Sequence, residues 1–148
     1  METAKPRVCA AVSGKPLRAL VLEDDPADFE ILEQDLADAG FAPECRRVET
    51  EAGFLAHLAP GIDIILSDYS LPGWNALRAL ELYRASRLDI PFIVVSGTIN
   101  EELAVECMKR GAADYLLKDR MGRLGPAITH AIENMDFFSN RINFTTRA

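Results

Sequence analysis

The chain has 148 residues, of which 49% are hydrophobic and 26% are charged, so it is long and apolar enough to form one folded domain. Its net charge of −7 argues against nucleic-acid binding, which needs clustered positive charge. No apolar run approaches the roughly 18 residues that a membrane span requires, and the three cysteines form no CxxC pair. We therefore expect a cytoplasmic protein with reduced thiols.

The first part of the chain predicts one strand and one helix. Residues 1–16 show no periodicity and are expected to form a flexible lead-in. A strand over 18–22 follows. Asp25 is then expected to cap a helix, because Pro26 suits the first helical position, and apolar residues recur at helical spacing as far as Gly40.

The middle of the chain predicts three strands. The first, over 43–48, is weaker in apolar character and is expected at or near an edge of the sheet, and a short helix follows Thr50. The apolar runs IDIIL (62–66) and IPFIVV (90–95) are typical of strands that are buried on both faces. A helix that begins near Asn75 lies between them.

The last part predicts a helix, a strand and another helix. Asn100 is expected to cap a helix that stops at Gly111. A short strand over 114–117 and a final helix over 121–138 come next. Residues 139–148 show no clear pattern and are expected to form a tail.

Strict alternation of five strands and five helices predicts a doubly wound α/β fold. In such a fold a parallel sheet carries helices on both faces, and its crossovers are right-handed. Functional side chains then gather at the carboxyl ends of the strands, near the point where the strand order reverses.

Chemically active residues follow four of the five predicted strands, and they become neighbours if the strand order is 2-1-3-4-5. Glu23 and Asp24 follow the first strand, Asp68 the third, Ser96 the fourth and Lys118 the fifth. Three close carboxylates need a cation or protonation, and oxygen ligands of this number suit Mg²⁺. A carboxylate beside such an ion can attack phosphorus and form an acyl phosphate. The site is therefore suited to accepting a phosphoryl group on Asp68.

These motifs resemble those of the response-regulator receiver domain of bacterial two-component signalling, over about residues 17–138. The resemblance rests on Glu23-Asp24, on Asp68 followed by Leu71-Pro72-Gly73, and on Ser96, Tyr115 and Lys118. It implies a flavodoxin-like (βα)5 fold with strand order 2-1-3-4-5. The chain would be a stand-alone receiver or a segment of a larger signalling protein.

The resemblance also implies a chemistry. Asp68 would accept a phosphoryl group from a sensor histidine kinase or a histidine phosphotransfer protein. Glu23, Asp24, Asp68 and the backbone carbonyl of Ser70 would hold Mg²⁺, and Lys118 would contact the phosphoryl group. The protein would assist only its own phosphorylation and dephosphorylation, and so would not be an enzyme acting on other molecules.

The implied output is a change of surface. Ser96 would move toward the phosphoryl group and Tyr115 would swing inward behind it. The face made by the fourth helix, the fifth strand and the fifth helix would then change its partners. No nucleic acid or membrane is expected among these partners, and the protein would be a monomer or a phosphorylation-linked dimer.

One departure from the family pattern and several alternative functions need to be considered. Asp119 stands where the family usually has proline, so a cis peptide after Lys118 is not assured, because a non-proline cis bond costs about 3 kcal/mol. A receiver fold that acts as a constitutive interaction module, without phosphorylation, is the alternative function. A haloacid-dehalogenase-like phosphohydrolase is disfavoured because Ser70 occupies the place of its second aspartate. A nucleotide-binding role is disfavoured because neither GxxxxGK(S/T) nor GxGxxG occurs.

Overall fold

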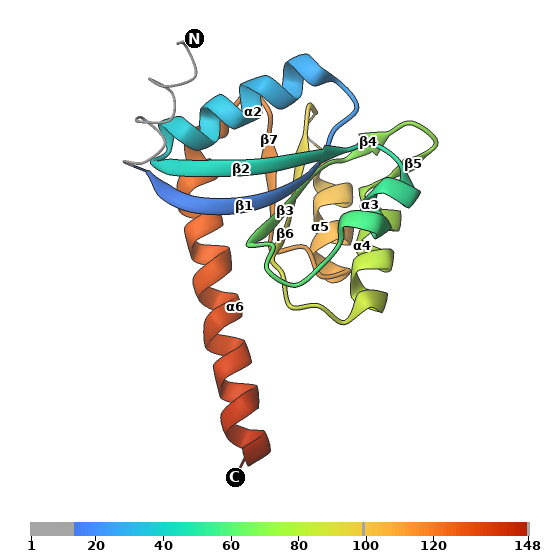
Figure 1. Cartoon of the computed structure of the whole chain (residues 1–148). Coiled ribbons are helices and arrows are strands. Elements are labelled where there is room, and N and C mark those ends of the chain that lie inside the picture. Colours follow the sequence, from blue (N-terminus) through green and yellow to red (C-terminus); the bar gives the residue numbers. More distant parts are fainter. Residues whose placement is uncertain (1–13, 99, 148) are drawn as a thin grey trace.

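The computed structural model describes residues 14–98 and 100–147, and side chains as far as residue 135 (Figure 1). Most of the predicted lead-in over 1–16 therefore lies outside the described residues. Lys15 and Pro16 already belong to the first strand, which starts earlier than predicted. The reason is pairing with the second strand, because Lys15 lies opposite Phe41 and its N–H donates to the carbonyl of Gly40 at 2.9 Å.

Five parallel strands form the central sheet, and their order matches the predicted 2-1-3-4-5. The strands are β1 (Lys15–Leu22), β2 (Phe41–Val48), β3 (Ile64–Asp68), β6 (Phe92–Ser96) and β7 (Asp114–Leu117), in the order β2-β1-β3-β6-β7. A small antiparallel pair, β4 (Ser70–Leu71) and β5 (Trp74–Asn75), was not predicted. The doubly wound, flavodoxin-like fold is thus confirmed.

Helices cover both faces of the sheet. They are α2 (Pro26–Asp38), α3 (Glu51–His57), α4 (Ala76–Ser86), α5 (Glu101–Lys109) and α6 (Leu124–Arg147), with a short 3-10 turn, η1 (Met121–Arg123), before the last. Figure 1 shows α2 and α6 on one side of the sheet and α3, α4 and α5 on the other. The predicted caps are confirmed, because Asp25 accepts from the N–H of Ala27 at 2.9 Å and Asn100 from that of Leu103 at 3.0 Å.

Two apolar layers hold this arrangement together, because successive residues of a strand point to opposite faces. Leu20 and Leu22 of β1 pack in the layer toward α3, α4 and α5, which contains Phe54 and Phe92. Ala19 and Val21 belong to the layer toward α2 and α6, which contains Leu36 and Ile128. The runs of β3 and β6 contribute to both layers, which explains their continuous apolar sequences.

Some boundaries differ from the prediction. Strand β3 begins at Ile64 and ends at Asp68, two residues later at each end than the predicted 62–66, because the buried Ser67 and the half-buried Asp68 pair with Val94 and Val95 of β6. The last helix begins three residues later than predicted, after η1, and α6 continues to Arg147 where a patternless tail was expected. Neither glycine nor proline follows Pro126, so nothing in the sequence stops a helix that packing has already nucleated. Figure 1 shows the C-terminal part of α6 extending past the sheet.

Among the residues that the structure describes, no helix is long and apolar enough to cross a membrane.

Candidate functional site

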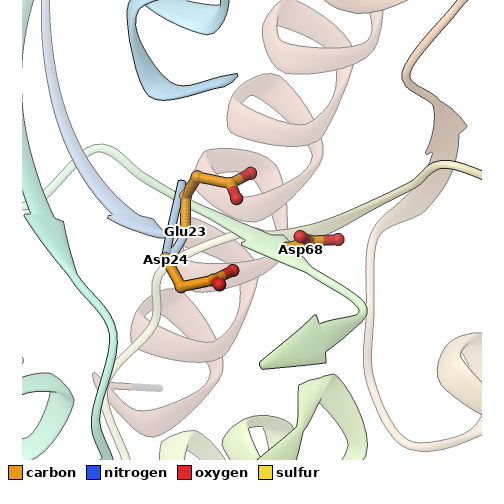
Figure 2. A group of neighbouring side chains, drawn as sticks. All are labelled: Glu23, Asp24 and Asp68. Atoms are coloured by element: carbon orange, nitrogen blue, oxygen red, sulfur yellow. The ribbon is translucent and has the colours of Figure 1, made fainter. Parts of the chain in front are cut away.

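Three carboxylates meet at the carboxyl edge of the sheet. Glu23 and Asp24 directly follow β1, and Asp68 is the last residue of the neighbouring β3. One oxygen of each lies within 4.8 Å of those of the other two. Figure 2 shows Glu23 and Asp24 side by side at the end of one strand and Asp68 at the end of the neighbouring one. The predicted gathering of these acids is therefore present in the structure.

The three acids differ in their exposure to solvent. Glu23 is buried, Asp68 is half-buried and Asp24 is exposed. Burial raises the pKa of Glu23, and the charge of Asp68 adds to this, although hydrogen bonds from Lys118 and the N–H of Asp25 oppose it. Burial likewise raises the pKa of Asp68, with Lys118 opposing the shift and Asp24 adding to it. The site thus favours neutralisation of its negative charge by protons or by a cation.

Lys118 supplies one positive charge to this site. It follows β7 directly, and its backbone N–H donates to the carbonyl of Ser96 at 2.8 Å. Its Nζ lies 3.0 Å from Glu23 Oε1, 2.9 Å from Asp28 Oδ2 and 3.2 Å from Asp68 Oδ2. Burial alone would lower the pKa of Lys118, but the hydrogen bonds to Asp28 and Glu23 and the charge of Asp68 outweigh it and hold the pKa above its ordinary value. The lysine is therefore charged at neutral pH.

Asp28 is the site residue that the sequence analysis missed. It lies in the first turn of α2, three residues after the capping Asp25. A signal for it was available, because the first turn of a helix that follows a parallel strand lies at the same edge as the end of that strand. At this helix start the sequence prediction concerns only Asp25 and Pro26 and does not include Asp28.

The two serines lie close to the cluster in the fold. Ser96 ends β6, next to β3, and is buried. Its hydroxyl donates to the carbonyl of Thr98 at 3.2 Å and accepts from the N–H of Thr98 at 3.3 Å. Both hydrogen bonds of the hydroxyl are therefore made within the loop that follows β6. Ser70 lies in β4, paired with Asn75, two residues after Asp68. The hairpin thus keeps the Ser70 backbone near the end of β3.

Tyr115 lies in β7, opposite Val94 of β6. Its ring packs against the apolar layer on the side of α3, α4 and α5. The phenolic oxygen is buried and has no hydrogen-bond partner among the described residues. The peptide bond between Lys118 and Asp119 is trans, as are the others of the described chain.

The fold and the site together define a receiver-type domain, in which a parallel sheet presents an acidic cluster and a lysine at the ends of its strands. The chain belongs to the family described as "Response regulator receiver domain", whose model matches residues 19–129. The resemblance stated from the motifs is thereby confirmed, and receiver domains of this family occur in two-component response regulators.

Individual relatives agree with this assignment. The two-component response regulator ARR2 of Arabidopsis thaliana is 32% identical over 103 residues, which cover 69% of this chain and 15% of that protein. A cyclic di-GMP phosphodiesterase of Thermotoga maritima is 28% identical over 130 residues, which cover 86% of this chain and 34% of that protein. The chain thus spans only a small part of the length of these relatives.

Solved structures agree on the fold. A response regulator receiver domain protein from Clostridium thermocellum superposes with a TM-score of 0.72, covering 82% of this chain and 98% of that one at 21% identity. At this identity the likeness is evidence for the fold alone.

Proposed function

We propose that this domain is a phosphorylation-controlled signalling switch with Asp68 as its phosphoacceptor. The observation that carries the proposal is the position of the Lys118 ammonium, 3.2 Å from Asp68 Oδ2 and 3.0 Å from Glu23 Oε1. A lysine in this place can neutralise an oxygen of a phosphoryl group on Asp68, while Asp24, which has no hydrogen bond to Lys118 among the described residues, is available to a cation. Membership of the receiver family supports a sensor histidine kinase or a histidine phosphotransfer protein as the donor.

The donor atoms of the acidic cluster fit Mg²⁺. All are carboxylate oxygens, which hard divalent cations prefer, and nitrogen or sulfur ligands are absent from the group formed by Glu23, Asp24 and Asp68. These three residues would hold the ion together with the backbone carbonyl of Ser70. When bound, Mg²⁺ would offset the negative charge on the phosphoryl oxygens.

The response would be carried by the face formed by α5, β7 and α6. Ser96 would exchange its local contacts with Thr98 for the phosphoryl group, and the inward position of Tyr115 would be the one that the switched state uses. Val105 and Met108 are large, exposed apolar side chains of α5, one of the three elements of this face, which supports a protein partner. The domain would work in the cytoplasm, as a monomer or as a phosphorylation-linked dimer, without nucleic acid or membrane.

The domain would catalyse nothing beyond its own phosphorylation and dephosphorylation. The Thermotoga relative named above is a phosphodiesterase, but this chain matches only 34% of its length. The activity of a whole relative is therefore not carried over to this domain.

Intact-mass spectrometry after incubation with acetyl phosphate tests the proposal. We expect a gain of one phosphoryl group that requires Mg²⁺ and is absent in Asp68→Ala. Asp89→Ala, which removes an exposed acid elsewhere, serves as the control and should be phosphorylated like the wild type.

Beryllofluoride binding, measured in the same samples, covers the case of an acyl phosphate that hydrolyses quickly. Failure of both readouts in the wild type would contradict the proposal and favour a constitutive interaction module.

A further inference from the structure

The Lys118 ammonium has as many carboxylate partners as it has N–H bonds. Its three donors face Glu23, Asp28 and Asp68, with distances of 3.0, 2.9 and 3.2 Å. An ammonium carries three donors and no acceptor. The donor capacity of Lys118 is therefore fully used in the unphosphorylated protein, and the shortest of the three contacts goes to Asp28.

Asp28 differs from the other two partners in place and exposure. It belongs to α2, and it is not a member of the group of three carboxylates whose oxygens lie together. Its side chain is 40% exposed, whereas those of Glu23 and Asp68 are 7% and 14% exposed. Water can replace the lysine as a partner of an exposed carboxylate at little cost, so Asp28 is the partner that Lys118 can most easily leave.

Phosphorylation of Asp68 would add oxygens that need the hydrogen-bond donors of Lys118. An oxygen of Asp68 forms the new bond to phosphorus, and the bond from phosphorus to acetyl phosphate's bridging oxygen breaks, so that acetate leaves with the electron pair. The group on residue 68 changes from one negative charge to two. Its new oxygens need hydrogen-bond donors, but every N–H of Lys118 is already engaged.

We propose that Asp28 is a positioning residue. Its hydrogen bond holds Lys118 before phosphorylation and slows the phosphorylation of Asp68 until that bond breaks. The inference rests on the proposed function of Asp68. Two effects act in the same direction. Asp28 lines the same cavity as Asp68, so its charge would repel a dianionic donor that enters there. The Asp28 carboxylate also competes with the phosphoryl oxygens for the same ammonium.

A matched control is available on the same helix. Asp35 also lies on α2, and it lines the same cavity beside the site, of about 120 Å³, as Asp28 and Lys118 do. No contact between Asp35 and Lys118 is found among the described residues. Asp35→Asn therefore makes the same change in net charge as Asp28→Asn without releasing the lysine.

The first measurement is the rate of phosphorylation by acetyl phosphate at saturating Mg²⁺, which removes differences in metal affinity. We expect Asp28→Asn to react about three to ten times faster than the wild type, as expected when one nearby charge and one charge-assisted hydrogen bond are removed. Asp28→Glu should restore the slower rate, and Asp35→Asn should gain clearly less than Asp28→Asn, because it removes a charge from the same cavity but releases no hydrogen bond of Lys118. An unchanged or lower rate in Asp28→Asn, or an equal increase in Asp35→Asn, would overturn the inference.

The second measurement does not depend on phosphorylation. The NMR signal of the Lys118 ammonium reports how fast its hydrogens exchange with water, because hydrogen-bonded donors are protected. Exchange should be faster in Asp28→Asn than in the wild type and in Asp35→Asn. Equal exchange in all three proteins would overturn the inference, even if Asp28→Asn reacts faster. A wild type that takes up no phosphoryl group, but shows the expected exchange, would instead contradict only the proposed function.

Discussion

Lys118 Nζ lies 3.2 Å from Asp68 Oδ2, although 50 residues separate the two along the chain. The same nitrogen contacts two further carboxylates. Lys118→Met leaves these acids without their cation, so we expect the free energy of unfolding at neutral pH to fall by about 1–3 kcal/mol. Chemical denaturation measures this loss. Lys109→Met, which removes an exposed lysine at the end of α5, should be close to neutral, and equal losses in both variants would contradict the expectation.

The raised pKa of Asp68 predicts how the stability of the folded protein depends on pH. Because burial raises this pKa above its ordinary value of 3.8, the folded protein binds the proton at a higher pH than the unfolded chain does. The charged carboxylate therefore lowers stability above the folded-state pKa, and this loss disappears as the pH falls below the ordinary value.

We thus expect Asp68→Asn to be more stable than the wild type at pH 7, and this advantage to shrink when the pH is lowered to about 4. Thermal denaturation across this range measures it. Asp89→Asn reports the effect of net charge alone, because Asp89 is exposed. An advantage of Asp68→Asn that grows as the pH falls would have the wrong sign.

Mg²⁺ should stabilise the folded protein through the acidic cluster. At a concentration ten times its dissociation constant, the ion would add about 1.4 kcal/mol to the free energy of unfolding. Asp24→Asn should reduce this gain, since Asp24 belongs to the cluster.

The adjacent Asp25→Asn is the matched control for the Mg²⁺ prediction. It makes the same change in charge, and asparagine can replace aspartate as the cap that accepts from the N–H of Ala27. Its response to Mg²⁺ should equal that of the wild type. Equal loss of the response in both variants would show that net charge, and not the cluster, attracts the ion.

Removal of the hydroxyl group should affect stability differently at Tyr115 and at Tyr83. The buried hydroxyl of Tyr115 has no partner among the described residues, so Tyr115→Phe should leave stability unchanged or raise it by about 1 kcal/mol. The hydroxyl of Tyr83 accepts from the buried N–H of Ile90 at 3.0 Å, so Tyr83→Phe should cost about 1–3 kcal/mol. Urea denaturation compares the two. A loss in Tyr115→Phe as large as that in Tyr83→Phe would indicate that Tyr115 has a hydrogen-bond partner.

Much of the fold followed from local features of the sequence. The buried strands β3 and β6 were evident because a strand covered on both faces needs a continuous apolar run. The starts of α2 and α5 were evident because Asp25 and Asn100 form their capping bonds with residues only two or three positions away. The end of α6 was not, because a helix that is nucleated by packing at its start can continue through residues without a clear apolar pattern.

The candidate site likewise has features that follow from the sequence and features that depend on tertiary packing. The sequence by itself determined that Glu23, Asp24, Asp68 and Lys118 lie at strand ends, since alternation of strands and helices places those ends at one edge of the sheet. Only the tertiary structure decided how Lys118 is shared among its acids. Asp28 becomes its nearest partner because α2 folds back beside the end of β7, 90 residues further along the chain. Spacing along the sequence carries no information about such a contact, because it depends on where two packed elements bring their side chains together.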